Sequence, residues 1–163
     1  MTKVVSIVFL MVAGLVIACH TQTVKTEKEK KFMTQEVNKT EEEWKEKLSP
    51  EQFHILREKG TEAPFSGKYY LNKEHGVYKC AACGNELFTD DMKFHSSCGW
   101  PSFDKEIAGG KIKTQTDLSH GMVRTEIMCA KCGGHLGHLF NDGPTETGMR
   151  YCVNSLSLDF EKK

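Results

Sequence analysis

Two matching cysteine motifs in this sequence could bind a metal ion. They are "CAACG", with Cys80 and Cys83, and "CAKCG", with Cys129 and Cys132. The short spacing lets both sulfurs of a motif reach one ion, and the glycine that follows allows the chain to turn tightly. Together the motifs supply four thiolates, the closed ligand set of a structural zinc ion. The sequence therefore predicts a zinc site made by these four cysteines.

A redox role is the competing interpretation of the same motifs. In an oxidising compartment, two Cys-x-x-Cys pairs could instead form or exchange disulfides. Neither pair has the aromatic and proline neighbours expected of a thioredoxin-like motif. The 45 residues between Cys83 and Cys129 exceed the usual spacing of a zinc ribbon, so an ion would join distant strands. We favour zinc, and the redox alternative stays open.

Cys152 lies in "RYCVNS", near the end of the sequence. If this segment is a strand, Arg150, Cys152 and Asn154 share one face. A cation beside a thiol stabilises the thiolate, which is the nucleophilic form of cysteine. The same alternation continues to Leu156 and Phe160, so this face must pass from a polar site into the core, or the strand must bulge. The alternative is a cysteine that packs as a small hydrophobic residue.

Cys98 lies in "FHSSCGWPSF", where glycine, proline and serines indicate an accessible loop. Trp100 in the Gly-Trp-Pro turn could pack in the core, or it could form an apolar wall for a ligand. Cys98 and Cys152 belong to neither cysteine motif. They could pair during a reaction or form a structural disulfide, and the sequence features leave both possibilities open.

Two histidines follow the second cysteine motif in "GGHLGHLFND". His135 and His138 have the side chain that proton transfer near neutral pH requires. They could instead be metal ligands, but a site that holds four thiolates would already be full. We therefore expect them to act as proton donors or acceptors.

The first residues have the features of a signal peptide. Lys3 precedes a run without charge that is short for a membrane-spanning helix. The run ends in "VIAC", which resembles a bacterial lipoprotein box in which Cys19 is lipidated; an ordinary secretory signal or an uncleaved anchor are the alternatives. We predict a signal peptide at residues 1–18, a flexible tether at 19–39 and a domain at 40–163. The protein would be a membrane-anchored lipoprotein facing the periplasm or the cell exterior.

The elements that must position these residues are two short helices and a mainly β body. Thr40–Glu43 fits a capping box, and Trp44 and Leu48 follow on one helix face. Ser49 is the N-cap of a second helix, which we expect to end at Gly60. Later runs with β-branched or alternating residues predict short antiparallel strands: "GVYKC", "KIKTQT", "MVRTEIMC" and "RYCVNSLSLDF".

Length and charge narrow the function classes. The 163 residues are enough for one domain with its own core. The 22 basic residues balance the 22 acidic ones, and no arginine-rich stripe could follow a phosphate backbone. We therefore expect no nucleic acid partner.

Several of these segments together resemble a known enzyme family. "PFSGKYY", "SSCGWPSF", "GGHLGHLFND", "RYCVNS" and the two cysteine motifs are similar in order and spacing to the B-type methionine sulfoxide reductases, which are specific for the R epimer at sulfur. The resemblance covers roughly Pro50 to Phe160. It implies a mainly β (α+β) fold of two antiparallel sheets held by zinc, with no organic cofactor. It also implies a monomer that uses methionine sulfoxide, free or in oxidised proteins, and a thioredoxin-like dithiol donor.

The resemblance also implies a role for each candidate residue. Cys152 would be the nucleophile, Cys98 the resolving cysteine and Trp100 the wall that receives the substrate methyl group. His135 and His138 would form the polar side of the pocket. Neighbours of the nucleophile and further pocket residues would be Arg150, Asn154, Phe140 and Asp142.

The chemistry of sulfoxide reduction fits these residues. Sulfoxide sulfur is electrophilic only if its oxygen can leave, so the site needs a thiolate at sulfur and a proton donor at oxygen. Cys152 would attack and His138 would protonate the oxygen, which leaves methionine and a sulfenic acid on Cys152. Cys98 would then close a disulfide that an external dithiol reduces.

Two alternatives from other functional classes remain at this point. The first is a non-catalytic, zinc-stabilised, lipid-anchored binding domain with the same fold. The second is a thiol-disulfide oxidoreductase, in which the histidine and tryptophan motifs would have no purpose.

Overall fold

A computed structural model describes residues 37–163 of the chain. The predicted signal peptide, the lipidation site at Cys19 and nearly all of the predicted tether lie outside these residues. Within residues 37–163, no helix is long and apolar enough to cross a membrane.

Two short helices, α2 (Glu41–Lys47) and α3 (Pro50–Leu56), each begin at a capping box. At the start of α2 the Thr40 hydroxyl accepts the N–H of Glu43 at 3.2 Å, and the Glu43 carboxylate accepts the N–H of Thr40 at 2.8 Å. These bonds satisfy N–H groups that a helix start otherwise leaves unpaired. Both predicted helices are confirmed, although α3 ends before Gly60, the position expected from the sequence.

The body consists of antiparallel strands, which confirms the predicted mainly β class. The strands are β1 (Gly76–Cys80), β2 (Glu86–Thr89), β3 (Lys93–Phe94), β4 (Ser102–Phe103), β5 (Ile112–Asp117), β6 (Arg124–Cys129), β7 (His135–Phe140), β8 (Arg150–Val153) and β9 (Leu158–Lys162). Three 3-10 turns join some of them: η1 (Asp90–Met92), η2 (Ser119–Gly121) and η3 (Ser155–Ser157).

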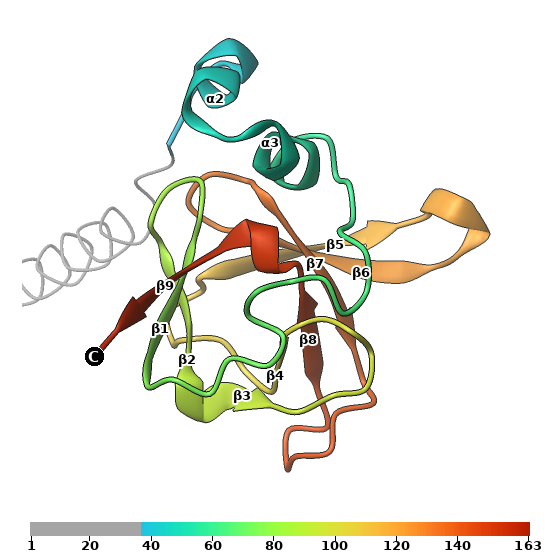
Figure 1. Ribbon diagram of the computed structural model, residues 1–163. Helices are drawn as coiled ribbons and strands as arrows, with labels where there is room; N and C mark the ends of the chain where they lie inside the picture. Colours follow the sequence, from blue (N-terminus) through green and yellow to red (C-terminus); the bar gives the residue numbers. More distant parts are fainter. Residues whose placement is uncertain (1–36) are drawn as a thin grey trace, which may run out of the picture. The chain divides into compact units, whose positions relative to one another are not determined.

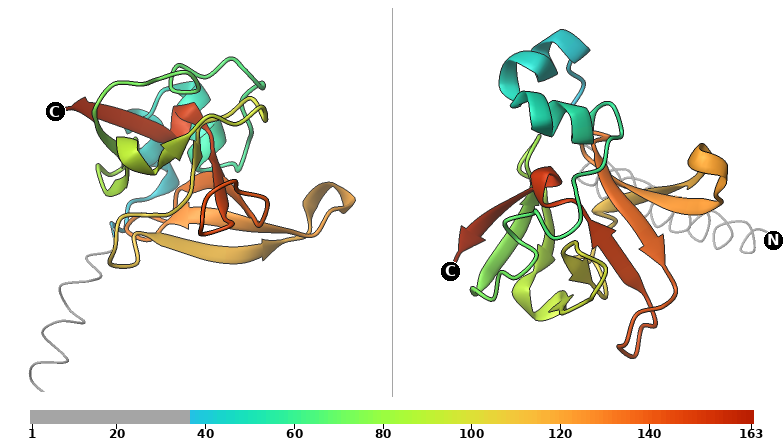
Figure 2. Two further views of the ribbon diagram at one scale, coloured as in Figure 1. Left: turned by 90° about the horizontal axis from the view of Figure 1, so that it is seen from below. Right: turned by 45° about the vertical axis from the view of Figure 1, so that its right-hand side comes forward.

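The strands form two sheets. One has three strands in the order β2-β1-β9, and the other has six in the order β3-β4-β8-β7-β6-β5. Figures 1 and 2 show α2 and α3 together at one end of the sheets, and the β5–β6 hairpin projecting from the body. The two antiparallel sheets and the short N-terminal helices are those predicted from the sequence.

Aromatic side chains form the core between the sheets. Phe88 of β2 and Phe103 of β4 stack with ring centroids 4.1 Å apart, and Tyr78 of β1 meets Phe103 edge-on at 5.0 Å. The same core includes Trp44 of α2. Burial of each large apolar side chain stabilises the fold by about 1.5–3 kcal/mol. The core therefore joins both sheets and the first helix into one unit.

The chain passes from one sheet to the other a few residues after Cys152. Strand β8 ends at Val153, the turn η3 follows, and β9 then pairs with β1 in the smaller sheet. In one continuous strand, the polar residues around Cys152 and the later apolar residues would share a face. The break separates them, because β8 belongs to the larger sheet and β9 to the smaller one. "RYCVNSLSLDF" is thus two strands with a turn between them.

A bulge in β7 changes which side chains share a face. Ile127 of β6 pairs with Gly137, but the next residue of β6 pairs with His135, so Leu136 is an extra residue in β7. In a regular strand, residues three apart point to opposite faces. Because of the bulge, the rings of His135 and His138 lie together, with centroids 5.6 Å apart.

Candidate active site and metal centre

Four cysteine sulfurs form a compact cluster where the two sheets meet. The sulfurs of Cys80, Cys83, Cys129 and Cys132 all lie within 4.8 Å of one another. The Cys80–Cys132 and Cys83–Cys129 contacts measure 3.7 and 3.6 Å. A tetrahedral ion with metal–sulfur bonds of about 2.3 Å separates its ligands by about 3.8 Å. The donor atoms and their spacing therefore fit a zinc ion.

The two motifs of the cluster turn in the same way. The N–H of Gly84 donates to the carbonyl oxygen of Cys80 at 2.8 Å, and the N–H of Gly133 donates to that of Cys129 at 2.9 Å. Both glycines have φ of 70°, a left-handed conformation that glycine adopts without steric cost. Cys80 ends β1 and Cys129 ends β6, so the cluster ties one end of each sheet together.

A row of polar side chains crosses one face of the larger sheet. Directly opposed residues on antiparallel strands point to the same face. Cys152 of β8 is opposite Ser102 of β4 on one side and His138 of β7 on the other. His138 in turn faces Glu126 of β6, which faces Gln115 of β5. We call these residues, one from each of five neighbouring strands, the polar row.

The thiols of Cys98 and Cys152 touch each other beside this row. Their sulfurs lie 3.7 Å apart, and Cys98 Sγ also lies 3.5 Å from Ser102 Oγ. Both are free thiols, and their separation is well above the bond length of about 2.04 Å in a disulfide. Both side chains are partly buried. Closing a disulfide between them therefore needs a small displacement of the Cys98 loop.

The two thiols affect each other's ionisation. The hydrogen bond with Cys152 lowers the pKa of Cys98 to about 4. The same hydrogen bond, together with burial, raises the pKa of Cys152, although the positive charge of Arg150 opposes this rise. One proton is thus shared by the pair, and the two thiols titrate together as a unit. The lowered pKa alone does not distinguish a nucleophile from a resolving cysteine.

A small cleft distinguishes the two cysteines, because Cys152 lines it and Cys98 does not. The cleft has a volume of about 120 Å³. Its walls combine aromatic and polar side chains: Thr61, Trp100, Arg124, His138, Phe140, Cys152 and Asn154. A small molecule or side chain with one apolar and one polar end could therefore place an atom against the Cys152 sulfur.

Glu62 connects the two sides of this cleft. Its carbonyl oxygen accepts the Trp100 indole N–H at 3.2 Å, and its N–H donates to Asn154 Oδ1 at 3.1 Å. Its buried carboxylate accepts the N–H groups of Ser155 and Leu156 at 2.6 and 3.0 Å, at the start of η3. The distance between the tryptophan wall and the strand that carries Cys152 is therefore set by one residue.

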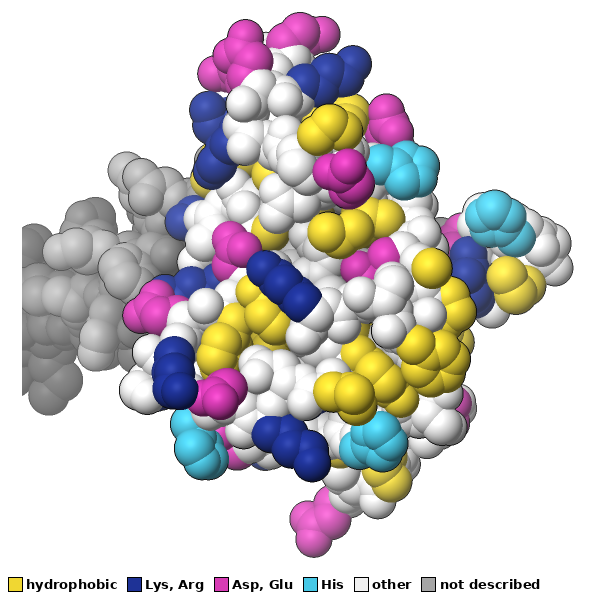
Figure 3. Space-filling view, in the orientation of Figure 1, with side chains coloured by type: hydrophobic (Ala, Val, Ile, Leu, Met, Phe, Trp, Pro, Cys, Tyr) yellow, Lys and Arg dark blue, Asp and Glu magenta, His cyan; other side chains and the backbone are white. Residues whose placement is uncertain are grey.

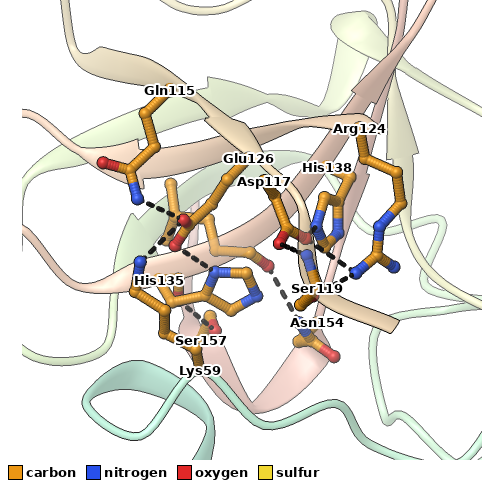
Figure 4. A network of polar contacts seen from close by, with 11 residues as sticks. Lys59, Gln115, Asp117, Ser119, Arg124, Glu126, His135, His138, Asn154 and Ser157 are labelled. Atoms are coloured by element: carbon orange, nitrogen blue, oxygen red, sulfur yellow. Dashed lines mark hydrogen bonds and ion pairs between the residues drawn. The ribbon is translucent and has the colours of Figure 1, made fainter. Parts of the chain in front are cut away.

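His138 is held by a carboxylate from the β5–β6 hairpin. Asp117 Oδ2 lies 2.8 Å from His138 Nε2 and 2.7 Å from Arg124 Nη2, and Asp117 Oδ1 accepts the N–H of Ser119 at 2.8 Å. Hydrogen bonds from Ser119, followed by the contact with His138, hold the pKa of Asp117 well below its usual range. The aspartate is therefore ionised near neutral pH, and it fixes the orientation of the His138 ring (Figure 4).

Arg150 is positioned by a carboxylate and an aromatic ring. Its Nε and Nη2 donate to the two carboxylate oxygens of Asp142 at 2.7 and 2.8 Å, and its guanidinium lies 4.4 Å from the centroid of the Phe140 ring. Such a bidentate pair fixes the plane of the guanidinium. The charge of Arg150 therefore stays close to Cys152.

A family model matches most of the described domain. The SelR domain model covers residues 48–162. The chain belongs to the SelR family. This match confirms the B-type methionine sulfoxide reductase family that the sequence motifs predict.

Curated relatives support the same family for this SelR domain. A protein of Leptospira interrogans serogroup Icterohaemorrhagiae serovar Lai is 58% identical over 131 residues, which are 80% of this chain and 100% of the relative. A Methanosarcina barkeri protein is 58% identical over 125 residues, 77% of this chain and 88% of its own. An Agrobacterium fabrum protein is 56% identical over 125 residues, 77% and 93% of the two chains. Each is named peptide methionine sulfoxide reductase MsrB.

The SelR domain brings most of the predicted site residues together. Those that line the cleft are Trp100, His138, Phe140, Cys152 and Asn154. Cys98 contacts Cys152 from the side, and His135 packs against His138 without lining the cleft. Asp142 and Arg150 also lie outside the lining, and they are connected to the cleft through Phe140, over whose ring the Arg150 guanidinium lies.

Sequence reasoning missed several residues of the site. Thr61 and Arg124 line the cleft, Asp117 holds His138, and Glu62 and Glu126 are buried carboxylates. The charged residues in the otherwise strand-like "VRTEIMC" were a usable signal, because a charge in the middle of a strand beside apolar residues needs a partner. The partners themselves come from distant segments and could not be inferred from spacing.

The surface of the SelR domain is apolar near the tip of the β5–β6 hairpin. Leu118 and Val123 are 69% and 80% exposed. Figure 3 shows further hydrophobic side chains gathered on the same face, below the projecting hairpin. Val123 directly precedes Arg124, which lines the cleft, so this exposed segment leads into the strand that carries a cleft residue.

Proposed function

We propose that this chain reduces the R epimer of methionine sulfoxide to methionine, with Cys152 as the nucleophile and Cys98 as the resolving cysteine. The observation that carries the proposal is the position of the Cys152 sulfur, which faces a cleft with an aromatic and a polar wall while it touches a second thiol. Membership of the SelR family supports the same reaction. A non-catalytic binding domain would need neither the thiol pair nor the oriented histidine.

The reaction begins when the proton shared by the two cysteines moves to Cys98 and the Cys152 thiolate attacks the sulfoxide sulfur. His138 lies directly opposite Cys152 on the polar row, and as an imidazolium it donates one proton to Asp117 through Nε2 and delivers the other to the sulfoxide oxygen. The oxygen then passes as a hydroxyl to the Cys152 sulfur, so methionine leaves and a sulfenic acid remains. The substrate sulfur gains two electrons, and the cysteine sulfur loses two.

The second half of the cycle restores the thiols. Cys98 attacks the sulfenic sulfur of Cys152, its thiol proton leaves with the hydroxyl group as water, and a disulfide forms. The contact between the two sulfurs favours this step, because Cys98 already lies against the atom that it attacks. A thioredoxin-like dithiol then reduces the disulfide and becomes a disulfide itself.

The walls of the cleft account for the choice of epimer. Trp100 and Phe140 offer apolar surface for the methyl group of the sulfoxide, while His138 and Asn154 offer polar contacts for its oxygen. These two substituents and the rest of the methionine side chain occupy three different directions around a chiral sulfur. Only one epimer places its oxygen against the polar wall while the sulfur faces Cys152.

We also propose that the four-cysteine cluster holds a structural zinc ion. The four thiolates are a closed ligand set, and their spacing suits a tetrahedral ion. The ion would hold the ends of β1 and β6 together, and all its positions would be filled by protein. The reaction itself uses the residues of the cleft.

The test of the proposed activity is an epimer-resolved assay on the chain from Thr21 onward, with a small dithiol as the reductant. The R epimer should be consumed and the S epimer left unchanged, because the arrangement of the two walls is handed. Chromatography of the remaining epimers measures both. Loss of the S epimer, or of neither, contradicts the proposal.

Cys98→Ser is the informative variant in this assay when thioredoxin is the reductant. It should form about one methionine per chain and then stop, since the sulfenic acid on Cys152 lacks a resolving thiol. Quenched reactions with the R epimer measure the stoichiometry, and a sulfenic acid probe should label the stalled chain. Full thioredoxin-driven turnover would mean that Cys98 is not the resolving residue.

We further propose that the protein is exported and anchored by a lipid on Cys19. The uncharged run followed by "VIAC" in the sequence supports this. The dithiol donor would then be a thioredoxin-like protein on the same side of the membrane. Mass spectrometry of the membrane fraction should find an acylated Cys19 at the N-terminus, and a chain that keeps residues 1–18 contradicts the anchor.

A further inference from the structure

Glu126 is a buried carboxylate on the polar row with three donors around it. Only 2% of the residue is exposed. Its Oε2 accepts hydrogen bonds from Lys59 Nζ at 2.8 Å and from Gln115 Nε2 at 2.6 Å. Its other oxygen, Oε1, lies 2.7 Å from His135 Nδ1 (Figure 4). An ionised carboxylate can only accept hydrogen bonds, so Nδ1 of His135 must carry a proton.

The second nitrogen of His135 has no such partner. The residue is 3% exposed, and its Nε2 is a buried polar atom without a hydrogen-bond partner among residues 37–163. In Figure 4 this nitrogen points away from Glu126, toward the side of Asn154, which lines the cleft. A buried polar atom without a partner is costly unless a bound group completes it. The nitrogen is therefore available to accept a hydrogen bond beside the cleft wall.

Lys59 determines the charge of this arrangement. Its ammonium group balances the Glu126 carboxylate, so the pair is neutral before His135 is considered. Burial lowers the pKa of His135, against the opposing effect of Glu126. The ring is therefore neutral at pH 7, with the proton on Nδ1 and a free electron pair on Nε2.

We infer that Glu126 is a positioning residue for sulfoxide reduction, which acts by fixing His135 in the tautomer that presents Nε2 as a hydrogen-bond acceptor beside His138 and Asn154, two residues of the cleft wall. This inference rests on the proposed function. During the reaction a hydroxyl group forms on the sulfoxide oxygen and then on the Cys152 sulfur, and such a group needs an acceptor. His138 has the opposite arrangement, because its Nε2 is the nitrogen held by Asp117. The two rings thus present different nitrogens.

The contacts of Glu126 make one substitution a tautomer switch. In Glu126→Gln, the amide oxygen should take the place of Oε2, because Lys59 and Gln115 both donate there. The amide NH₂ then faces Nδ1 of His135 and donates to it. His135 must respond by moving its proton to Nε2, so the acceptor beside the cleft wall becomes a donor. The shape of the side chain is otherwise unchanged.

The experiment compares Glu126→Gln with the wild-type chain in single-turnover reduction of the R epimer. We expect the rate of methionine formation to fall roughly 10- to 100-fold. This is a smaller loss than the one expected when a general acid or base is removed entirely. The substrate concentration at half-saturation should change much less. Nitrogen-15 NMR should show the His135 proton on Nδ1 in the wild type and on Nε2 in the variant. A wild-type rate in the variant, or an unchanged tautomer, overturns the inference.

Repeating the comparison in a chain that carries His135→Asn tests whether Glu126 acts through His135. His135→Asn retains a donor at the Nδ1 position and removes Nε2, so Glu126→Gln should cause no further loss of rate in this background. Multiplicative losses would mean that Glu126 has a merely structural role. Glu106→Gln is the matched control, because this half-buried carboxylate accepts the N–H of Ile112 at 2.8 Å and contacts no residue of the cleft. It should retain the wild-type rate.

Two milder variants cover the case in which Glu126→Gln does not fold. Lys59→Met and Gln115→Leu each remove one donor to Oε2 and keep the contact with His135. Each should slow the reaction a few-fold in the wild-type background and not at all with His135→Asn. Equal effects in both backgrounds overturn the inference. If the wild-type chain itself leaves the R epimer unchanged, the proposed function fails, and that outcome is distinct from these.

Discussion

Cys152→Ser should abolish the reduction of methionine sulfoxide, with a loss of roughly 10³-fold or more in the rate of methionine formation. A serine hydroxyl has nearly the shape of the thiol but ionises far less readily, so the attacking group is lost while the cleft keeps its form. Neither Cys98 nor any other thiol lines the cleft within residues 37–163, so none can replace it. The epimer-resolved assay measures the effect directly.

The control for this prediction is the state of the variant chain. It should melt at nearly the wild-type temperature and bind zinc equally, because Cys152 is outside the metal cluster. In the wild type, a thiol-specific probe should label Cys152 and the R epimer should slow the labelling. An active Cys152→Ser chain would show that another residue is the nucleophile. A Cys152 thiol that does not react with the probe would favour a non-catalytic binding domain.

Removal of zinc should have the largest effect on stability. The cluster joins the end of β1 to the end of β6, so its loss releases one end of both sheets. Structural zinc contributes about 10–16 kcal/mol in zinc-finger peptides, and we expect Cys129→Ser to lower the free energy of unfolding by on the order of 5 kcal/mol or more. Elemental analysis should find about one zinc ion per wild-type chain. Thermal unfolding with and without a chelator measures the change.

Cys98→Ser is a suitable reference for the zinc experiment. It removes a thiol that lies outside the four-sulfur cluster, so metal content and melting temperature should match those of the wild type. Wild-type protein that contains no zinc, or a Cys129→Ser chain that is as stable as the reference, would contradict a structural metal. The two Cys-x-x-Cys pairs would then return to a redox interpretation.

Local signals in the sequence were enough to predict the helices and the metal cluster. A capping box depends on residues three apart, so Thr40 and Glu43 define the start of α2 without any tertiary information. The two cysteine motifs are likewise local turns, and only their meeting is a tertiary event. A structural zinc ion needs four ligands and each motif supplies only two thiolates. The clustering of the two motifs therefore also follows from the sequence.

Features that depend on strand register could not be predicted. The sequence shows His135 and His138 three apart, which in a regular strand would separate them, and only the bulge at Leu136 brings them together. The partners of Glu126 come from Lys59 and Gln115, on other segments of the chain. Such contacts arise from pairing between distant strands, and no short window of the sequence contains both members.

The polar row has a consequence for how this protein could fail. Each of five neighbouring strands contributes one member, and each member faces the next only in the native register. A slip of one residue between any two strands would turn one side chain to the opposite face and break the row. Activity therefore reports whether the strands have paired in the native register. A chain with the normal amount of strand but one pair of strands out of register would be inactive.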